Sequence, residues 1–257
     1  MIDIHTHILP NVDDGSGSWE ESLALIKKAR NDGVKGLVCT SHIYDVLNQE
    51  IESDWIRKFQ ELKRRVQQEQ IEIALWLGAE IHCNAKFDTR SRLFTLNGNG
   101  KYTLMELPLQ EFPINAEETL FQLSIKDYVP ILAHPERNGS IIQKPSIAYE
   151  MVMRGILLQV NAGSITGVFG KRIRRLALDF IDRDLAHFVA SDCHNTGRRS
   201  IYLKEAYKKV KKRWGTEKAD LLFKLNPLRA VQGKSIPVAS PISFEKKRKN
   251  RLIGLLS

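Results

Sequence analysis

Two histidines separated by one residue, His5 and His7, lie at the very start of this sequence. A matching pair, Asp192 and His194, follows an apolar segment near the other end. Side chains alternate between the two faces of a strand, so both members of each pair project to the same side. Imidazole and carboxylate groups in such pairs are typical ligands of divalent metals. The two pairs therefore indicate metal chemistry.

Further candidate ligands lie near the ends of apolar segments between these pairs. They are His42, Glu80, Glu106 and His134. Any one of them could equally be a hydrogen-bonded core group. Together, at the mouth of an apolar barrel, such groups would each cost about 1–3 kcal/mol if unpaired, whereas divalent ions would satisfy them jointly. The joint pattern favours a cluster of metal ions.

Seven short apolar segments are predicted to be buried strands, and helical patterns separate most of them. Strands that alternate with helices predict a parallel sheet in an α/β fold. We expect a (β/α) barrel, because barrel enzymes assemble their sites where the strands end. An open doubly wound sheet is the alternative, but Asp13-Asp14-Gly15 stands where its glycine-rich phosphate loop would be. The predicted strands are residues 2–7, 36–42, 73–82, 102–109, 129–134, 157–161 and 187–192.

The chain changes character after residue 232. Its 257 residues suit one barrel, and we expect that domain over residues 1–232 with a flexible tail over 233–257. Much of the net charge of +9 lies in five basic residues near the C-terminus, so it is a poor argument for nucleic-acid binding. A charged terminus is usually solvated. Residues 244–257 could also settle on an anionic membrane, at roughly 1 kcal/mol per basic residue.

Cysteine usage and hydropathy bear on the compartment. The three cysteines form no Cys-x-x-Cys pair, and an odd number in a chain of this size predicts a reducing, intracellular setting. No signal peptide precedes His5, and no apolar run approaches the roughly 20 residues of a spanning helix. The expected location is the cytoplasm, and the inner face of the membrane is a second expected place within it.

With these motifs, the sequence resembles the PHP (polymerase and histidinol phosphatase) metallohydrolases. Within them it is most similar to the bacterial protein-tyrosine phosphatases that regulate capsule and exopolysaccharide synthesis. The likeness runs from residue 1 to about residue 230 and implies a distorted seven-stranded barrel. The segments that carry it are residues 1–5, 13–15, 78–80, 133–137 and 190–192.

The resemblance implies a site for three ions, with manganese favoured and zinc or iron as alternatives. One ion would be held by His5, His7, Glu80 and Asp192. Glu80 would bridge to a second ion held by Glu106 and His134. Asp14, His42 and His194 would hold a third, and Asp13 could replace Asp14 as the ligand.

Such ions suit phosphoester hydrolysis. They lower the pKa of bound water from 15.7 to about 7, which supplies hydroxide, and they neutralise charge on the phosphoryl oxygens. Arg137 and Arg198, which follow His134 and His194, are predicted to bind phosphate bidentately. The alternative for each is a salt-bridging surface arginine. Arg199 competes with Arg198, because the intervening loop is too short to fix which one turns inward.

We therefore predict a metal-dependent protein-tyrosine phosphatase. The resemblance implies that its substrate is a membrane-bound bacterial tyrosine kinase. A small-molecule phosphatase, such as one for histidinol phosphate, or a phosphodiesterase with the same ions is the alternative. A non-catalytic binding protein has little support, because every ligand position is filled. The basic residues of 171–175 leave a nucleic-acid substrate as an alternative. However, the apolar stripe of the same helix predicts that these basic residues form a solvated face.

A second mechanism is suggested by the segment from Cys193 to Ser200. It fits Cys-x5-Arg-Ser, the pattern of phosphatases that attack phosphorus with a thiolate. However, the segment has a single glycine, and strand alternation turns Cys193 away from the face that carries Asp192 and His194. We expect Cys193 to be a packed core thiol.

Overall fold

Parallel strands form the centre of the structure, a computed structural model that describes residues 1–245. The strands are β1 (Ile2–Thr6), β2 (Gly36–Cys39), β3 (His42–Ile43), β4 (Val46–Leu47), β5 (Ala74–Leu77), β6 (Glu80–His82), β7 (Lys86–Phe87), β8 (Tyr102–Glu106), β9 (Val129–Ala133), β10 (Leu157–Asn161) and β11 (Ala186–Ala190). They pair as three sheets, with the orders β1-β2-β5, β11-β10-β9-β8-β6-β3 and β4-β7. Every pairing between these strands is parallel, so the α/β expectation is confirmed.

Two of the predicted strands are split between sheets. Residues 36–42 become β2 and the start of β3, and residues 73–82 become β5 and β6. The two segments remain hydrogen-bonded to each other across the break, where Gly78 N donates to Cys39 O and Glu80 N donates to Ser41 O. His42 and Glu80 were expected at or near the ends of long strands, but each opens a short new strand, and they face each other as register partners.

The strands do not form one continuous closed sheet, so the barrel expected from the sequence is not confirmed. At the remaining edge, the segment that follows β11 meets β1 through a single parallel bridge between Thr6 and Cys193. His7 N donates to Cys193 O, and Asp192 N donates to His5 O. The first strand and the segment after the last one therefore lie side by side, as the two ligand pairs require.

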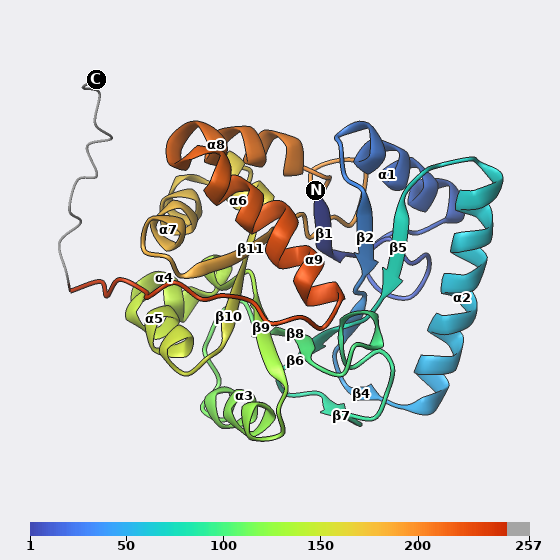
Figure 1. Cartoon of the computed structure of the whole chain (residues 1–257). Helices are drawn as coiled ribbons and strands as arrows, with labels where there is room; N and C mark the ends of the chain where they lie inside the picture. The colour runs from blue at the N-terminus through green and yellow to red at the C-terminus, as the bar shows by residue number, and fades with distance from the viewer. Residues whose placement is uncertain (246–257) are drawn as a thin grey trace.

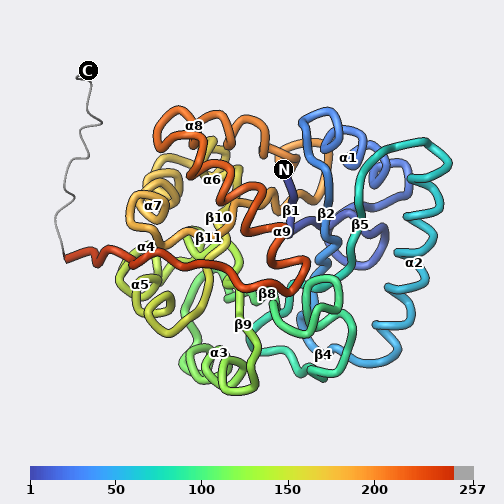
Figure 2. Tube along the Cα trace, in the orientation of Figure 1, coloured from blue at the N-terminus to red at the C-terminus, as the bar shows by residue number. Residues whose placement is uncertain are grey.

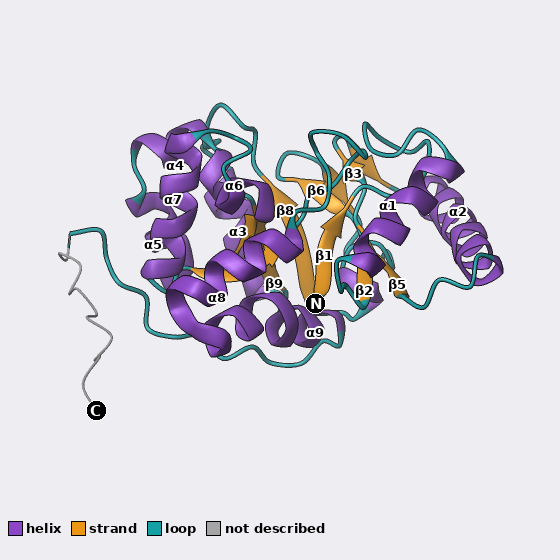
Figure 3. Ribbon diagram, turned by 90° about the horizontal axis from the view of Figure 1, so that it is seen from above, coloured by secondary structure: helices purple, strands orange, loops and turns teal. Residues whose placement is uncertain are grey.

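Helices flank the strands on both sides (Figures 1 and 3). They are α1 (Trp19–Asn31), α2 (Gln49–Gln68), α3 (Ala116–Ile125), α4 (Gly139–Gln143), α5 (Ser146–Met153), α6 (Ala162–Thr166), α7 (Lys171–Asp182), α8 (Leu203–Asp220) and α9 (Asn226–Val231). α1 and α2 lie beside the three-stranded sheet, and α3 to α8 lie on the side of the six-stranded sheet. Amphipathic sequence explains this: α7 buries Leu176, Ala177, Phe180 and Ile181 of its predicted apolar stripe and exposes Lys171, Arg172, Arg174 and Arg175.

An apolar cluster fills the space between the strands. Its members on the strands include Ile4, Val38, Leu104, Ile131 and Phe188. α9 adds Ala230 and Val231 to the same cluster and lies near the N-terminus, at the end where β1 begins (Figure 3). The polar site residues lie at the opposite end of the strands, where β1, β8, β9 and β11 finish.

After α9 the chain crosses the face of the molecule without forming a helix or strand, as far as residue 245 (Figure 2). It is held there by contacts: Tyr102 Oη donates to Lys234 O, Ile242 N donates to Arg183 O, and the Arg183 guanidinium lies 4.3 Å from the centre of the Phe244 ring. The basic run of the predicted tail, residues 246–257, lies outside the described residues. Among the helices of residues 1–245, we find no segment with the length and hydropathy of a membrane span.

Candidate metal centre

His5 of β1 and His7, just after that strand, meet a glutamate from β6 and an aspartate that follows β11. His5 Nε2 and His7 Nε2 lie 3.0 Å apart. Glu80 Oε2 is 3.1 and 3.3 Å from these two nitrogens, and Asp192 Oδ1 is 3.6 and 3.4 Å from them. Four ligand atoms about 2.1 Å from one ion lie about 3.4 Å apart in a tetrahedron. The four residues predicted to share one ion therefore have the spacing of ligands.

Glu80 also faces a second group. Its Oε1 lies 3.1 Å from His134 Nε2, and its Oε2 lies 3.0 Å from His42 Nδ1. Glu106 completes this group, with Oε1 at 3.6 Å from His134 Nε2 and Oε2 at 3.3 Å from His42 Nδ1. Glu80 lies between the two groups, where a bridging carboxylate would be. The resemblance implied a second group of Glu80, Glu106 and His134. In the structure, His42 contacts both of these glutamates as well.

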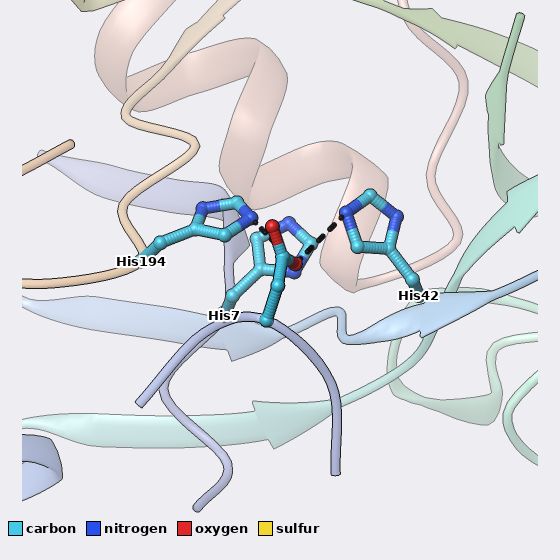
Figure 4. Close-up of side chains that lie close together, drawn as sticks. His7, His42 and His194 are labelled. Carbon is cyan, nitrogen blue, oxygen red and sulfur yellow. Dashed lines mark ion pairs between the residues drawn. The ribbon is translucent and has the colours of Figure 1, made fainter. Parts of the chain in front are cut away.

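A third group gathers around Asp14. Its Oδ1 lies 3.5 Å from His42 Nε2 and 3.3 Å from His194 Nε2, and Figure 4 draws these two ion pairs as dashed lines. His7 belongs to the same group, and its ring stacks on that of His194 with 3.8 Å between centroids. His42 thus turns one ring nitrogen toward each of two groups. All nine predicted ligands fall in overlapping groups whose ligand atoms lie within 4.8 Å of one another.

Asp13 and Asp14 have different partners. Asp13 Oδ2 lies 2.7 Å from His7 Nδ1 and accepts from His42 N at 2.9 Å, while its Oδ1 accepts from Gly15 N. Asp13 therefore orients a neighbouring imidazole, and Asp14 faces the cluster. Gly15 is required for this turn, because a Cβ there would lie 2.3 Å from His7 O.

The carboxylates of the cluster favour the charged form of two of its histidines. Burial lowers the pKa of His5 and His42, but Glu80 outweighs it, with Asp192 beside His5 and Glu106 beside His42, and raises these pKa values to about 9 and about 11. Although burial acts to raise it, the pKa of Glu80 is held well below its usual range by His5 and His42. The carboxylates therefore hold positive charge next to them, and divalent ions compete with protons for such places.

The donor set fits divalent ions. Within residues 1–245, three buried atoms of the cluster lie in ion-pair contact with neighbouring ligands, but none of these contacts has the geometry of a hydrogen bond: His42 Nδ1, Glu80 Oε2 and His194 Nε2. A buried polar atom left unpaired costs about 1–3 kcal/mol. An ion that accepts lone pairs from imidazole and carboxylate satisfies all three, which is the fit that the sequence led us to expect.

Two of the candidate ligands have unusual backbone conformations. His134 follows β9 with φ of 33°, and Asp192 follows β11 with φ of 53°, both in the left-handed region. A non-glycine residue there costs on the order of 1–3 kcal/mol and is concentrated at functional sites. This backbone conformation directs each side chain away from the line of the preceding strand and toward the cluster.

The structure separates the three candidate arginines. Arg137 Nη1 donates to Asp192 Oδ2 at 2.7 Å, and its guanidinium lies 4.6 Å from the centre of the Phe169 ring. Arg199 Nη1 donates to Asp14 Oδ2 at 2.9 Å. Arg198 is exposed. Of the two neighbours, Arg199 is therefore the one that turns toward the cluster, in place of the predicted Arg198, because the Asn195 side chain accepts from Arg199 N and closes the loop on that side.

Cys193 is fully buried within the apolar core. Burial raises the pKa of its thiol above the ordinary value, with Asp3 and Asp192 adding to the effect. A thiolate nucleophile needs the opposite shift and an accessible sulfur. The expectation of a packed core thiol is confirmed.

Three polar residues around the cluster were missed from the sequence. Gln159 and Asn161 of β10 are fully buried, and their side chains contact His5 and Asp192 respectively. Buried Glu136 accepts from Asn161 N. The sequence does contain a signal for two of them. Gln159-x-Asn161 places polar side chains at alternate positions of an apolar strand, which is the same pattern as His5-x-His7.

Tyr44 lies at the exposed edge of the cluster. Its ring stacks on that of His42, with 4.6 Å between centroids and 23° between planes, and the residue is 52% exposed. An exposed aromatic ring beside buried site residues is available to contact a substrate.

Comparisons with known proteins agree on one family. The family described as capsular polysaccharide synthesis, CpsB/CapC, matches residues 1–232. Tyrosine-protein phosphatase YwqE of Bacillus subtilis (strain 168) is 34% identical over 234 residues, which cover 87% of this chain and 92% of YwqE. Tyrosine-protein phosphatase CpsB of Streptococcus agalactiae serotype III (strain NEM316) is 32% identical over 231 residues, covering 87% and 95%.

A solved structure is similar over nearly the whole chain. It comes from crystallographic work on YwqE of Bacillus subtilis and CpsB of Streptococcus pneumoniae, described as metal-dependent tyrosine phosphatases. It superposes with a TM-score of 0.86 at 31% sequence identity, covering 96% of this chain and 100% of that one.

Proposed function

This chain belongs to the CpsB/CapC family of capsular polysaccharide synthesis proteins, and we propose on that basis that it is a metal-dependent phosphatase of phosphotyrosine in proteins. The observation that carries the proposal is the convergence of nine imidazole and carboxylate side chains in overlapping groups with ligand spacing. The similar proteins named tyrosine-protein phosphatases support the reaction and its substrate.

Three divalent ions are proposed to bind here, with manganese favoured and zinc or iron as alternatives. Divalent ions supply hydroxide at neutral pH and neutralise charge on phosphoryl oxygens. The residues that would hold them are His5, His7, Asp14, His42, Glu80, Glu106, His134, Asp192 and His194.

The arginines and Tyr44 would bind the substrate. A guanidinium forms two parallel hydrogen bonds to phosphate oxygens, and both Arg137 and Arg199 are already held at the cluster by carboxylates. Tyr44 offers its exposed ring to the aromatic ring of phosphotyrosine. A tyrosyl leaving group has a pKa of about 10 and departs with less help from an acid than an alkyl alcohol needs.

The proposed substrate is a membrane-bound bacterial tyrosine kinase, together with its targets in capsule and exopolysaccharide synthesis. The family description supports the link to capsule synthesis. A cytoplasmic location at the inner face of the membrane suits such a substrate, and the basic and apolar residues of 244–257 would provide peripheral contact there.

We extend the proposal to the fold. The two main sheets would act as one distorted seven-stranded PHP barrel, in which β2 with β3 and β5 with β6 each count as one interrupted strand. The apolar cluster shared by β1, β2, β8, β9, β10 and β11 supports this view, as does the contact of β1 with the segment after β11. The barrel domain would span residues 1–232.

A substrate panel tests the function. The full-length protein is assayed with a phosphotyrosine peptide, the matching phosphoserine peptide, histidinol phosphate and an aryl phosphodiester, each with Mn²⁺ and with a chelator. We expect Mn²⁺-dependent turnover that is fastest on the phosphotyrosine peptide. Preference for histidinol phosphate or for the diester would replace the proposal with a small-molecule phosphatase or a phosphodiesterase.

A further inference from the structure

β10 contributes a side-chain hydrogen-bond chain and none of the proposed metal ligands. Gln159 and Asn161 project from the same face of this strand, and both are fully buried. Gln159 Oε1 lies 2.8 Å from His5 Nδ1, Gln159 Nε2 lies 2.8 Å from Asn161 Oδ1, and Asn161 Nδ2 lies 2.8 Å from Asp192 Oδ2. Three hydrogen bonds therefore join two residues proposed to bind the same ion.

The direction of each bond in this chain follows from the acceptor at its end. The carboxylate of Asp192 is paired with the Arg137 guanidinium, whose Nη1 donates to Oδ2 at 2.7 Å, and an ionised carboxylate only accepts hydrogen bonds. Asn161 must therefore present its NH₂ group to Asp192 and its oxygen to Gln159. Gln159 must then donate to Asn161, which leaves its own oxygen facing His5.

His5 Nδ1 must carry a hydrogen as a result. A carbonyl oxygen accepts and never donates, so the 2.8 Å contact from Gln159 Oε1 is satisfied only by an Nδ1–H group. The neutral ring then has its lone pair on Nε2, the atom that lies 3.0 Å from His7 Nε2 and 3.1 Å from Glu80 Oε2. In the neutral ring that a metal ion requires, the nitrogen without a hydrogen is therefore the one turned into the cluster.

The backbone of β10 that carries this hydrogen-bond chain is also held in place. Glu136 Oε1 accepts from Asn161 N at 2.9 Å and from the Ser164 hydroxyl at 2.6 Å. Glu136 lies between His134 and Arg137, so the turn that follows β9 also fixes β10. Asp192 Oδ2 receives a further hydrogen bond from Arg137 Nη1, which leaves Oδ1 as the oxygen facing the histidines.

We propose that Gln159 and Asn161 are positioning residues that lock His5 in the Nδ1–H tautomer and couple its orientation to that of Asp192. Metal-ligating histidines usually donate their other ring N–H to an outer partner, whose loss costs 10–100-fold in metal affinity or activity. Here the partner is an amide chain that ends on a second ligand. The inference rests on the proposed metal binding, and it does not require the phosphatase activity.

Mn²⁺ titration in the absence of substrate tests the coupling, with free Mn²⁺ followed by electron paramagnetic resonance. We expect Gln159→Leu to bind the His5 ion 10–100-fold more weakly. Gln159→Glu should restore most of the affinity, because a carboxyl oxygen still accepts from His5 Nδ1–H. Thr103→Val is the matched control: this fully buried β8 hydroxyl donates to Met105 Sδ, outside the cluster, and its loss should leave affinity unchanged.

Two outcomes would overturn the proposal: unchanged affinity in Gln159→Leu, or equal losses in Gln159→Leu and Gln159→Glu. Urea unfolding of the metal-free variants shows whether each one folds. If Gln159→Leu does not fold, nuclear magnetic resonance of the ¹⁵N-labelled wild-type protein with Zn²⁺ decides. A slowly exchanging His5 Nδ1–H signal is expected, and an Nε2–H signal would contradict the assignment. A protein that binds Mn²⁺ in this way but hydrolyses no phosphotyrosine would refute the proposed function alone.

Discussion

Arg199 Nη1 donates a 2.9 Å hydrogen bond to Asp14 Oδ2, joining two loops that are 185 residues apart in the chain. The second terminal nitrogen of the same guanidinium lies 3.4 Å from Asp192 Oδ1. Arg199 therefore spans carboxylates from two of the three groups in the cluster. If ions bound these carboxylates, the guanidinium would remain beside them with donors available for a phosphate.

Replacing Arg199 should impair catalysis more than replacing its neighbour. A hydrogen bond to a charged group contributes about 1.5–3 kcal/mol, so Arg199→Ala should lower kcat/KM for a phosphotyrosine peptide roughly 10- to 100-fold. Arg198→Ala is the matched control, because Arg198 is exposed, and it should retain nearly full activity. The reverse order of effects in steady-state kinetics would return the phosphate role to Arg198.

Tyr44 should contribute to recognition of the tyrosine ring. Aromatic pairs are worth about 0.5–1.5 kcal/mol beyond the area they bury. Tyr44→Ala should therefore raise KM for a phosphotyrosine peptide by roughly 2- to 12-fold, while Tyr44→Phe keeps the ring and the wild-type KM. Inhibition by inorganic phosphate, which has no ring, should be the same in all three proteins. A loss in Tyr44→Phe equal to that in Tyr44→Ala would assign the effect to the hydroxyl instead.

Cys193 should be dispensable for turnover. Its sulfur is fully buried and its pKa is raised by burial, so Cys193→Ser should retain most of the kcat of the wild-type protein. His7→Ala removes a proposed ligand and should abolish activity. Both variants are assayed with Mn²⁺, and their metal content is measured. An inactive Cys193→Ser protein with its full metal content would favour a thiolate mechanism over the metal mechanism.

His187 should make the fold less stable as pH falls. Burial, with Lys218 nearby, lowers the pKa of His187 to about 4, below the value of about 6.5 in an unfolded chain. The unfolded state therefore takes up the proton first as pH falls. The free energy of unfolding should decrease from about pH 6.5 to about pH 4, by on the order of 3 kcal/mol from this residue.

The variant His187→Asn isolates that contribution. The Asn oxygen can replace His187 Nδ1 as the acceptor for Leu158 N, and it does not titrate. Urea unfolding of both proteins at several pH values should show a steeper loss of stability in the wild type below about pH 6.5. Parallel curves for the two proteins would show that His187 has a normal pKa.

Eight of the nine candidate ligands could be anticipated from residue type and from their places near the ends of apolar segments, whereas Asp14 came from the family resemblance. Strand alternation fixes the common face of His5 and His7, and parallel strands bring their ends together. The breaks near Gly78 and Ser41 could not be predicted, because only tertiary hydrogen bonds show the strand change. His42 consequently contacts two groups, although the sequence suggested one.

The arginines and the amide chain show a different limit. Arg198 and Arg199 are identical in type and adjacent, so only the folded loop, closed by Asn195, decides which one turns inward. Gln159 and Asn161 alternate along an apolar strand, but amides are not common metal ligands, so their residue type does not mark them as part of a metal site. Their role depends on the neighbours that two other strands supply.

Metal removal and restoration test the central claim most directly. The purified full-length protein is analysed for bound metal, treated with a chelator and assayed on a phosphotyrosine peptide before and after addition of Mn²⁺. We predict bound divalent metal, loss of turnover in the metal-free protein and recovery with Mn²⁺. Full turnover by protein shown to contain no metal would contradict the account.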